Sequence, residues 1–128
     1  MLYDPRMGKK NAPGSGALKD HCRSLPGTTE DIKWGDNHVF SVGGKMYAAF
    51  NLDDESQYGF KCDDEDFDEL TEREGIIPAP YAARFGWVSV REPGSLRAAE
   101  ARRLIEKSHR LVASKLTKKL QRELGLIE

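Results

Sequence analysis

The pair Gly43-Gly44 lies between two hydrophobic runs, and it constrains the fold more than any other feature of the sequence. In residues 37–42 and 45–52, alternate side chains form one largely apolar face, which is typical of half-buried strands. A two-residue turn of the hand that suits a hairpin needs positive φ at both positions, which glycine accepts. A phosphate-binding loop would lead into a helix and would carry a third glycine or a Gly-Lys-Ser/Thr ending. The stretch therefore predicts a β-hairpin, and a nucleotide-using enzyme loses its main support.

The other predicted elements surround this hairpin. Leucine and cysteine at helical spacing predict a helix over about residues 17–24, and residues 58–62 read as a third strand. Asp63 is expected to cap an acidic helix, residues 86–92 form a fourth strand, and Ser95 is expected to cap the long last helix. The predicted order is α-β-β-β-α-β-α. The fold class is therefore α+β, a single antiparallel sheet with helices packed on one face.

The remaining segments are predicted to be irregular. Residues 28–37 read as a connector, and residues 75–85, which contain two prolines, as an ordered loop. At 128 residues the chain is long enough for one domain. We expect a flexible leader over 1–16, the folded domain over 17–119, and a helical C-terminal extension over 120–128.

Composition limits the setting of the protein. No apolar run is long enough to cross a membrane, and no secretory signal is visible at the N-terminus, so we expect a cytoplasmic protein without a membrane partner. Cys22 and Cys62 are far apart and belong to no CxxC pair. We interpret them as reduced thiols, although the spacing leaves a disulfide open. The sequence does not indicate an oligomeric state.

Charge is distributed unevenly although the net charge is −1. Residues 53–74 are strongly acidic and residues 97–122 strongly basic, which makes the molecule electrically polar. Acidic side chains crowd the start of the second helix, but no set of histidines and cysteines converges on them, so no metal site is predicted. Four cations of the last helix are candidate phosphate contacts: Arg102, Arg103, Lys107 and Arg110.

Side-chain parity divides the sheet into two faces. Val88 and Val90 are expected to face the core with Met46, Ala48, Phe50 and Phe60. Parity then predicts a free face that combines aromatic rings with cations, a combination that suits phosphates and bases. Its expected members are Lys45, Tyr47, Lys61, Trp87, Ser89 and Arg91.

Several segments resemble the MmcQ/YjbR family of small bacterial proteins. They are "DIKWGDNHVFSVGGKMYAAFNLD", "GFKCDDEDFDEL", "PAPYAARFGWVSV" and "IEKSHRLVASKLTKK", and they occur in family order over about residues 18–119. The resemblance implies a fold similar to that of bacterial frataxin (CyaY) and a description as DNA-binding proteins with a double-wing motif. It brings no catalytic residues and no cofactor. Family-typical positions are Trp34, Gly35, Phe40, Gly43, Gly44, Lys45, Lys61, Trp87 and Lys115.

These features of the sequence predict a binding protein rather than an enzyme. The three histidines are scattered, so no nucleophile–base pair or cofactor site is visible. We expect DNA binding through the cationic and aromatic sheet face. The alternative is a module that binds a protein or a small anionic ligand. The residues predicted to make these contacts are Lys45, Tyr47, Lys61, Arg84, Trp87 and Arg91.

Overall fold

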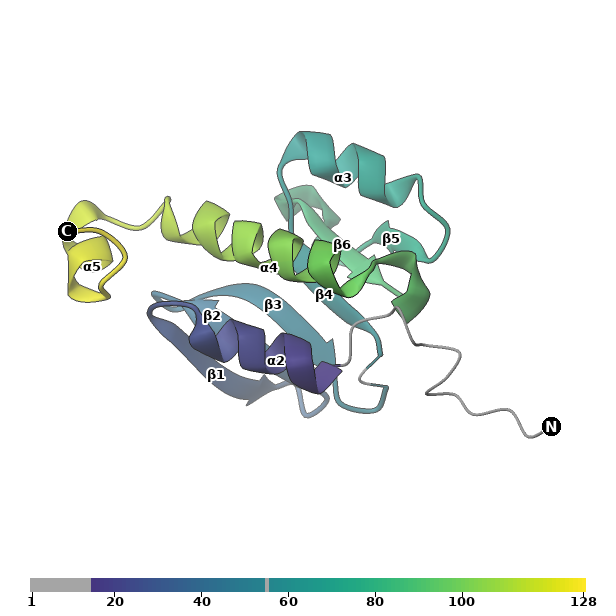
Figure 1. The fold of residues 1–128 in the computed structure, drawn as a ribbon, viewed down its shortest axis with the longest axis horizontal. Helices are drawn as coiled ribbons and strands as arrows, with labels where there is room; N and C mark the ends of the chain where they lie inside the picture. The colour runs from purple at the N-terminus through teal and green to yellow at the C-terminus, as the bar shows by residue number, and fades with distance from the viewer. Residues whose placement is uncertain (1–14, 55) are drawn as a thin grey trace.

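The computed structural model describes residues 15–54 and 56–128, and it confirms the α+β class. The described residues form one six-stranded antiparallel sheet in the order β1-β2-β3-β4-β6-β5 (Figure 1). The strands are β1 (Thr28–Lys33), β2 (Asn37–Val42), β3 (Lys45–Asn51), β4 (Tyr58–Lys61), β5 (Ile76–Pro78) and β6 (Trp87–Val90). The helices are α2 (Ser15–Ser24), α3 (Asp64–Thr71), α4 (Ala98–Ala113), α5 (Lys118–Glu123), and the short 3₁₀ turns η1 (Ala83–Phe85) and η2 (Pro93–Ser95).

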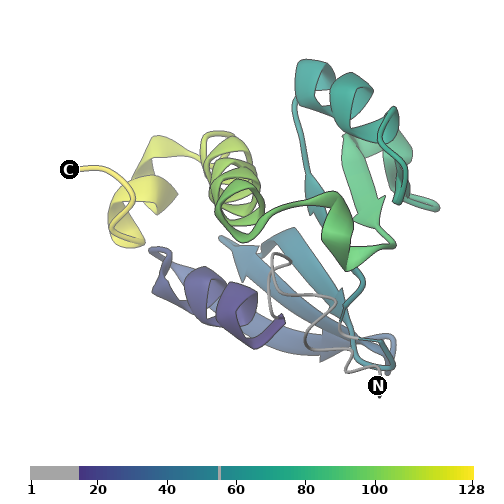
Figure 2. The ribbon, with the colours of Figure 1, turned by 45° about the vertical axis from the view of Figure 1, so that its right-hand side comes forward.

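Helix α4 organises the core. It lies between α2 and α3 in both views of the ribbon and runs over the middle of the sheet (Figures 1 and 2). Its apolar stripe, which includes Ala101, Leu104 and Ile105, is buried, because these side chains recur at three- and four-residue steps. The sheet contributes Phe50 and Phe60, both fully buried, to the same cluster.

The glycine hairpin forms as predicted. Gly43 and Gly44 have φ of 59° and 80°, so both occupy the left-handed region that the turn requires. A β-carbon on Gly43 would lie 2.6 Å from a methyl carbon of Leu116, so the turn also packs closely against the segment after α4. The two glycines therefore serve chain reversal and packing.

The start of α3 is the one predicted from the sequence, whereas α4 starts later in the chain than predicted. The Asp63 side chain accepts a hydrogen bond of 2.8 Å from the backbone N–H of Asp66, which confirms the predicted cap. Ser95 does not cap the last helix, because α4 begins after Arg97 and the Ser95 hydroxyl donates to the carbonyl of Glu74 instead. Residues 93–95 form a 3₁₀ turn that displaces the helix start.

Two strands occupy segments that were predicted to be irregular. β1 lies at one edge of the sheet, where its mostly exposed polar residues give no alternating apolar signal. β5 lies at the other edge and has only three residues, of which the last is Pro78. Edge strands tolerate such residues because only one side of each pairs with a neighbour.

The chain after α4 folds back onto the domain. Thr117 caps α5 by accepting from the N–H of Leu120, and the Gln121 amide donates to the carbonyl of Leu116 at 2.7 Å. Leu124 and Leu126 pack against the core cluster. The predicted leader lies largely outside the described residues, and the boundaries of domain and extension stay predictions.

Candidate ligand-binding groove

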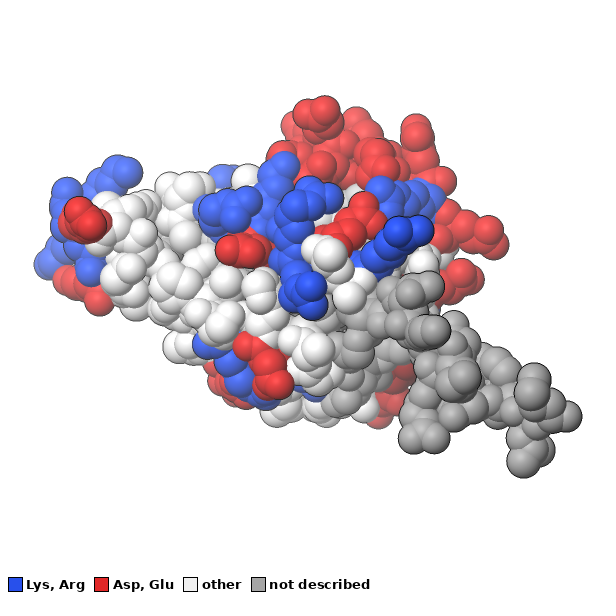
Figure 3. Space-filling model, in the orientation of Figure 1, with Lys and Arg blue, Asp and Glu red and all other residues white. Residues whose placement is uncertain are grey.

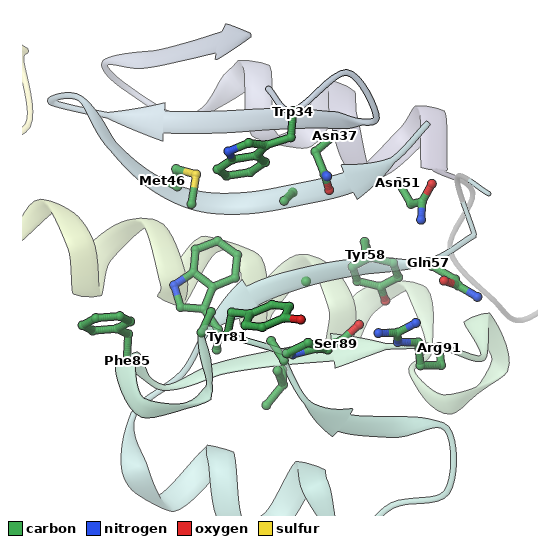
Figure 4. Close-up of a pocket in the computed structure, with 17 residues that line it drawn as sticks. Trp34, Asn37, Met46, Asn51, Gln57, Tyr58, Tyr81, Phe85, Ser89 and Arg91 are labelled. Carbon is green, nitrogen blue, oxygen red and sulfur yellow. The ribbon is translucent and has the colours of Figure 1, made fainter. Parts of the chain in front are cut away.

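A groove of about 700 Å³ opens on the sheet face opposite α2 and α4. Met46 and Ala49 line it, whereas Tyr47, Ala48 and Phe50, which are adjacent to them in the chain, belong to the core on the other side. Figure 4 shows the groove from this face, with the side chains of Trp34, Met46 and Tyr81 around it. The lining residues are Trp34, Asn37, Met46, Ala49, Asn51, Gln57, Tyr58, Gly59, Ala79, Pro80, Tyr81, Ala82, Phe85, Trp87, Val88, Ser89 and Arg91.

Aromatic residues in connecting segments form the two rims of the groove. Trp34 lies in the β1–β2 turn, and Tyr81 and Phe85 lie between β5 and β6, on the opposite side (Figure 4). Their exposed fractions are 70%, 101% and 54%, which is unusual for three large rings around one hollow. Trp34 and Tyr81 have φ of 56° and 66°. Positive φ is costly for such residues, and strained backbone of this kind clusters at functional sites.

Trp87 and Gly59 shape the floor of the groove. Gly59 lies next to the strand of Trp87, and a β-carbon on Gly59 would lie 3.7 Å from the Trp87 ring and 2.8 Å from the backbone oxygen of Val88. The missing side chain therefore lets the backbone of β6 approach β4 closely, and the indole lies in contact range of the same glycine. Trp87 does not belong to the helix-side core cluster, but only 9% of it is exposed, so the ring forms the floor of the groove and, contrary to the prediction, does not project into water.

The polar part of the lining is cationic or neutral. Arg91 lies at one end of the groove, and Met46 with Phe85 lies at the other (Figure 4). Amide and hydroxyl side chains supply the other polar groups, and no carboxylate occurs among the described lining residues. The groove is thus an aromatic trough with a positive end.

A second hollow of about 260 Å³ adjoins the groove and shares Met46 and Trp87 with it. It lies at the C-terminal end of α4, where β3 and β4 separate. All of its charged lining residues are lysines. The lining residues are Lys45, Met46, Lys61, Trp87, Val112, Lys115 and Leu116.

Ser108 explains why the two strands separate there. The β3–β4 ladder ends at the pair Ala48 and Phe60. Beyond it, the Ser108 hydroxyl accepts from the N–H of Lys61 at 3.0 Å and donates to the carbonyl of Tyr47 at 2.7 Å. A buried helix side chain thus replaces the direct strand-to-strand bond and holds the strands apart.

The placement predicted for Tyr47 is wrong. The register of the β2–β3 hairpin shifts after Phe40, so that Ala48 faces Phe40, Met46 faces Ser41, and Tyr47 is the extra residue of a bulge. Tyr47 is fully buried on the helix side, where its hydroxyl contacts the Thr28 hydroxyl and donates to the carbonyl of Cys22. Burial raises the pKa of this phenol above its usual value.

Because of the same bulge, the side chains of Met46 and Lys45 lie on the opposite face of the sheet from the one predicted for each. Met46, expected in the core, lines the groove instead. Lys45 pairs with Val42, whose side chain is buried in the helix-side core, and residues opposite one another share a face. Lys45 is exposed and lines the second hollow, with residues of the C-terminal part of α4.

Comparisons with known proteins place the chain in a family. The YjbR family model matches residues 23–111. The chain belongs to the YjbR family. Its structure is similar to the crystal structure of Deinococcus radiodurans protein DR2400, which carries the domain named DUF419, with 28% identity and a TM-score of 0.79 over 90% of this chain and 89% of that one. It is also similar to a Pseudomonas syringae protein solved by structural genomics, with 26% identity and a TM-score of 0.58 over 73% of this chain and 93% of that one. A comparison with curated proteins found no match.

In this YjbR protein, the remaining predicted contact residues are divided between two faces. Arg84 is exposed, and its guanidinium lies 4.7 Å from the centre of the Phe85 ring at the groove rim. Arg102, Arg103 and Arg110 are exposed on α4, whose buried side packs on the opposite face of the sheet. The structure therefore does not bring the α4 arginines together with the groove.

Lys107, the fourth candidate phosphate contact of α4, is held by carboxylates. Its ammonium lies 2.7 Å from Asp63 and 2.8 Å from Asp66. Figure 3 shows Lys and Arg gathered over α4 and Asp and Glu over α3 above it. These paired groups raise the pKa of Lys107 and lower that of Asp63. A phosphate at Lys107 would have to compete with both acids.

The two cysteines of this YjbR protein line neither the groove nor the second hollow. Cys22 and Cys62 are free thiols, and burial raises the pKa of each to about 12. Within residues 15–54 and 56–128, no group of three or more His, Cys, Asp or Glu side chains is arranged to hold a metal ion. Over the same residues, no helix has the length and apolarity needed to cross a membrane.

Sequence reasoning missed the exposed rings that define the groove. The sequence marks Trp34 only as a family-typical position and places Tyr81 and Phe85 in an ordered loop. No pattern of period two or 3.6 marks them, because they lie in turns. The available signal was the presence of bulky aromatic residues in segments rich in glycine and proline, where rings are seldom needed for packing.

Proposed function

We propose that this YjbR protein binds single-stranded nucleic acid in the groove and catalyses no reaction there. One observation carries the proposal: the groove and the adjoining hollow combine aromatic rings with cations and contain no acidic lining residue among the described ones. The chain has 21 acidic and 20 basic residues, so a lining of one sign is a selective arrangement. An anionic ligand with flat rings is the complementary chemistry.

The exposed rings favour an unpaired strand over a duplex. Trp34, Tyr81 and Phe85 offer ring surface that can stack on a base only where the base is not already stacked in a helix. Among the described residues, the α-helices that pack on the sheet lie on the opposite face, so none of them projects into a duplex groove from this side. Sequence-tolerant stacking is therefore the mode that the groove supports.

Cations at both ends of the groove would contact the phosphates of such a strand. Arg91 lies at one end, and the lysines of the second hollow adjoin the end marked by Met46. Phosphates at the two ends would leave the intervening bases over the rings. Two neutralised phosphates, one at each end, predict that the logarithm of affinity falls with the logarithm of salt concentration with a slope of about −1.4.

The groove volume favours a second candidate, a small aromatic anion. About 700 Å³ lies within the range of pockets that enclose a single small-molecule ligand. A mononucleotide or an aromatic carboxylate would use the same rings and cations. This candidate replaces the first if such compounds saturate the groove while oligonucleotides do not compete.

The test uses the two tryptophans of the chain, both of which line the groove. Stacking of a base quenches indole fluorescence, so titration with DNA and RNA single strands of about ten nucleotides reports on the site itself. We expect saturable quenching at low salt that weakens steeply at higher salt, with a matched duplex binding less tightly. Absence of quenching by any single strand at low salt would overturn the proposal.

The matched variants are Trp34→Gly and Tyr81→Gly. Glycine accepts the positive φ of both positions, so each variant removes a ring and relieves backbone strain together. Each should lower affinity by about tenfold, because stacking on one base contributes about 1–3 kcal/mol. The control is Ile32→Ala, which removes a half-exposed apolar side chain outside the groove. Equal losses in the control and the ring variants would contradict the stacking role.

A further inference from the structure

The hollow at the end of the β3–β4 seam brings three lysines together. Lys45 comes from β3, Lys61 from β4 and Lys115 from the segment after α4. These are separate parts of the chain, so the cluster is a product of the fold and not of a basic run in the sequence. Its uncharged walls are apolar side chains: Met46, Trp87, Val112 and Leu116.

The local backbone holds one of these lysines in place. The Lys61 ammonium donates a hydrogen bond to the carbonyl of Phe85, the last residue of η1. The next residue, Gly86, has φ of 83°, and its carbonyl accepts from the N–H of Cys62 at 2.7 Å. A β-carbon on Gly86 would lie 2.6 Å from the carbonyl oxygen of Cys62 and 3.9 Å from the Lys61 nitrogen. The close approach that glycine allows therefore fixes η1 beside β4 and Lys61 beside the hollow.

The three ammonium groups have no acidic partner in direct contact. Among the described residues, no ion pair to Lys45, Lys61 or Lys115 occurs, and Asp64 acts on Lys61 only at longer range. Partial burial, followed by the charge of Lys115, lowers the pKa of Lys61 below its usual value. Like charges held close together without counter-charges raise the free energy of the empty site, and a bound anion removes that cost.

We propose that this hollow is a binding site for one phosphate group. A tetrahedral dianion offers acceptors to several lysines at once, and charge-assisted hydrogen bonds of this kind are stronger than neutral ones. The shared Met46 and Trp87 place the phosphate next to the aromatic groove. In the biological setting this site rests on the proposed function, because it assigns one phosphate of the bound strand to the hollow.

The test separates the phosphate site from nucleic-acid binding by using inorganic phosphate as the probe. Thermal unfolding and amide NMR spectra are recorded against phosphate, with sodium chloride of equal ionic strength as the reference. We expect saturable stabilisation by phosphate and shifted amide signals at residues 45, 61 and 115. If phosphate acts no differently from chloride, the proposal fails even where single strands still bind in the groove.

Variants assign the effect to the hollow. Lys45→Gln and Lys115→Gln change exposed side chains and should each lower phosphate affinity by about tenfold, the loss expected for one charged hydrogen bond. Lys118→Gln and Lys119→Gln are the controls, because both lysines are exposed on α5 and line neither hollow. Equal losses in the two sets would show diffuse charge attraction and would overturn the site.

A final pair of probes identifies the source of the phosphate. If the hollow takes a terminal phosphate, a 5′-phosphorylated single strand should bind about tenfold more tightly than its unphosphorylated counterpart, and Lys115→Gln should abolish the difference. If it takes a phosphate between nucleotides, the two strands should bind equally and lose affinity equally in the variant. If phosphate binds saturably but neither strand binds, the phosphate site is supported and the proposed function is overturned.

Discussion

Two groups of cations in this protein differ in their partners: Lys107 and Arg73 on the α3–α4 side, and the cations that line the two hollows on the groove side. On the first side, Lys107 contacts Asp63 and Asp66, and Arg73 contacts Glu69 and Glu100, all at 2.7–2.9 Å. On the groove side, among the described residues, the four cations of the two hollows have no such partners (Arg91, Lys45, Lys61 and Lys115).

This difference shows why net charge is a poor guide to partners here. A net charge of −1 suggests no affinity for polyanions, because it averages the paired and unpaired groups. Ion pairs at the surface add little stability, but they neutralise the charges that an incoming phosphate would meet. Cations that line a hollow and contact no acid among the described residues, as Arg91, Lys45, Lys61 and Lys115 do, are therefore the candidates for a binding surface.

The largest expected effect on affinity comes from introducing an acidic side chain into the second hollow. Lys115→Glu should lower the affinity for single strands by about 100-fold at low salt, because it removes one attraction and adds one repulsion. The same change should leave the fold intact or stabilise it slightly, since the new carboxylate lies near Lys45 and Lys61. Fluorescence titration and chemical denaturation measure the two effects. Tight binding by the variant would show that the cations of the hollow do not determine affinity for the strand.

A smaller effect is expected in the core beneath the hairpin. Tyr47→Phe removes the hydroxyl that contacts Thr28 at 2.8 Å and donates to Cys22 at 3.1 Å, and should lower the free energy of unfolding by about 1–2 kcal/mol. Affinity for single strands should not change, because Tyr47 lies on the helix side. Urea denaturation and the fluorescence titration test both statements. A variant that folds normally but binds poorly would show that Tyr47 contributes to binding.

The arginines on the exposed side of α4 should matter less. Arg103→Gln and Arg110→Gln are expected to change affinity by less than about threefold at physiological salt, because screening weakens attraction beyond about 8 Å. Binding assays in 0.15 M salt measure this. Losses as large as those of the groove lysines would mean that the helix face also contacts the ligand, as the sequence alone had predicted.

The smallest effect concerns Lys107, a cation with acidic partners, and is seen in the stability of the fold at low pH. The hydrogen bond from Lys107, and then that from the Asp66 N–H, lowers the pKa of Asp63, so the ionised carboxylate stabilises the fold above its unfolded pKa. That contribution disappears as pH falls below about 4. Lys107→Gln should cost less than about 1 kcal/mol at neutral pH, because the pair is partly exposed. The variant should also show a shallower acid decline in stability by denaturation at pH 2–5, whereas an unchanged slope would mean that Lys107 does not act on Asp63.

The sequence predicts the fold better than the site, and the reasons are local. Gly43-Gly44, the strands at 58–62 and 86–92, and the Asp63 cap carry strong short-range signals, and the structure contains all of them. The bulge at Tyr47 has no comparable signal, because it depends on how β3 adjusts to β2. One extra residue was enough to reverse the faces of Met46 and Tyr47.

The groove was partly predictable. Trp87, Arg91 and Lys61 follow from strand parity on β4 and β6, where the ladder is regular. Trp34 and Tyr81 do not, because the folded chain alone brings two distant turns to opposite rims. Lys115 joins Lys45 only through the path of α4 across the seam, which no local pattern encodes.

The two outer strands have a consequence for how copies of the protein behave at high concentration. β1 exposes charged side chains, including Glu30 and Asp31, along its unpaired side, and β5 is three residues long and ends in a proline. Charges, brevity and a missing N–H each discourage a foreign strand from adding to a sheet. Although its inner strands are strongly apolar, the sheet is therefore protected at both margins from growth into fibrous aggregates.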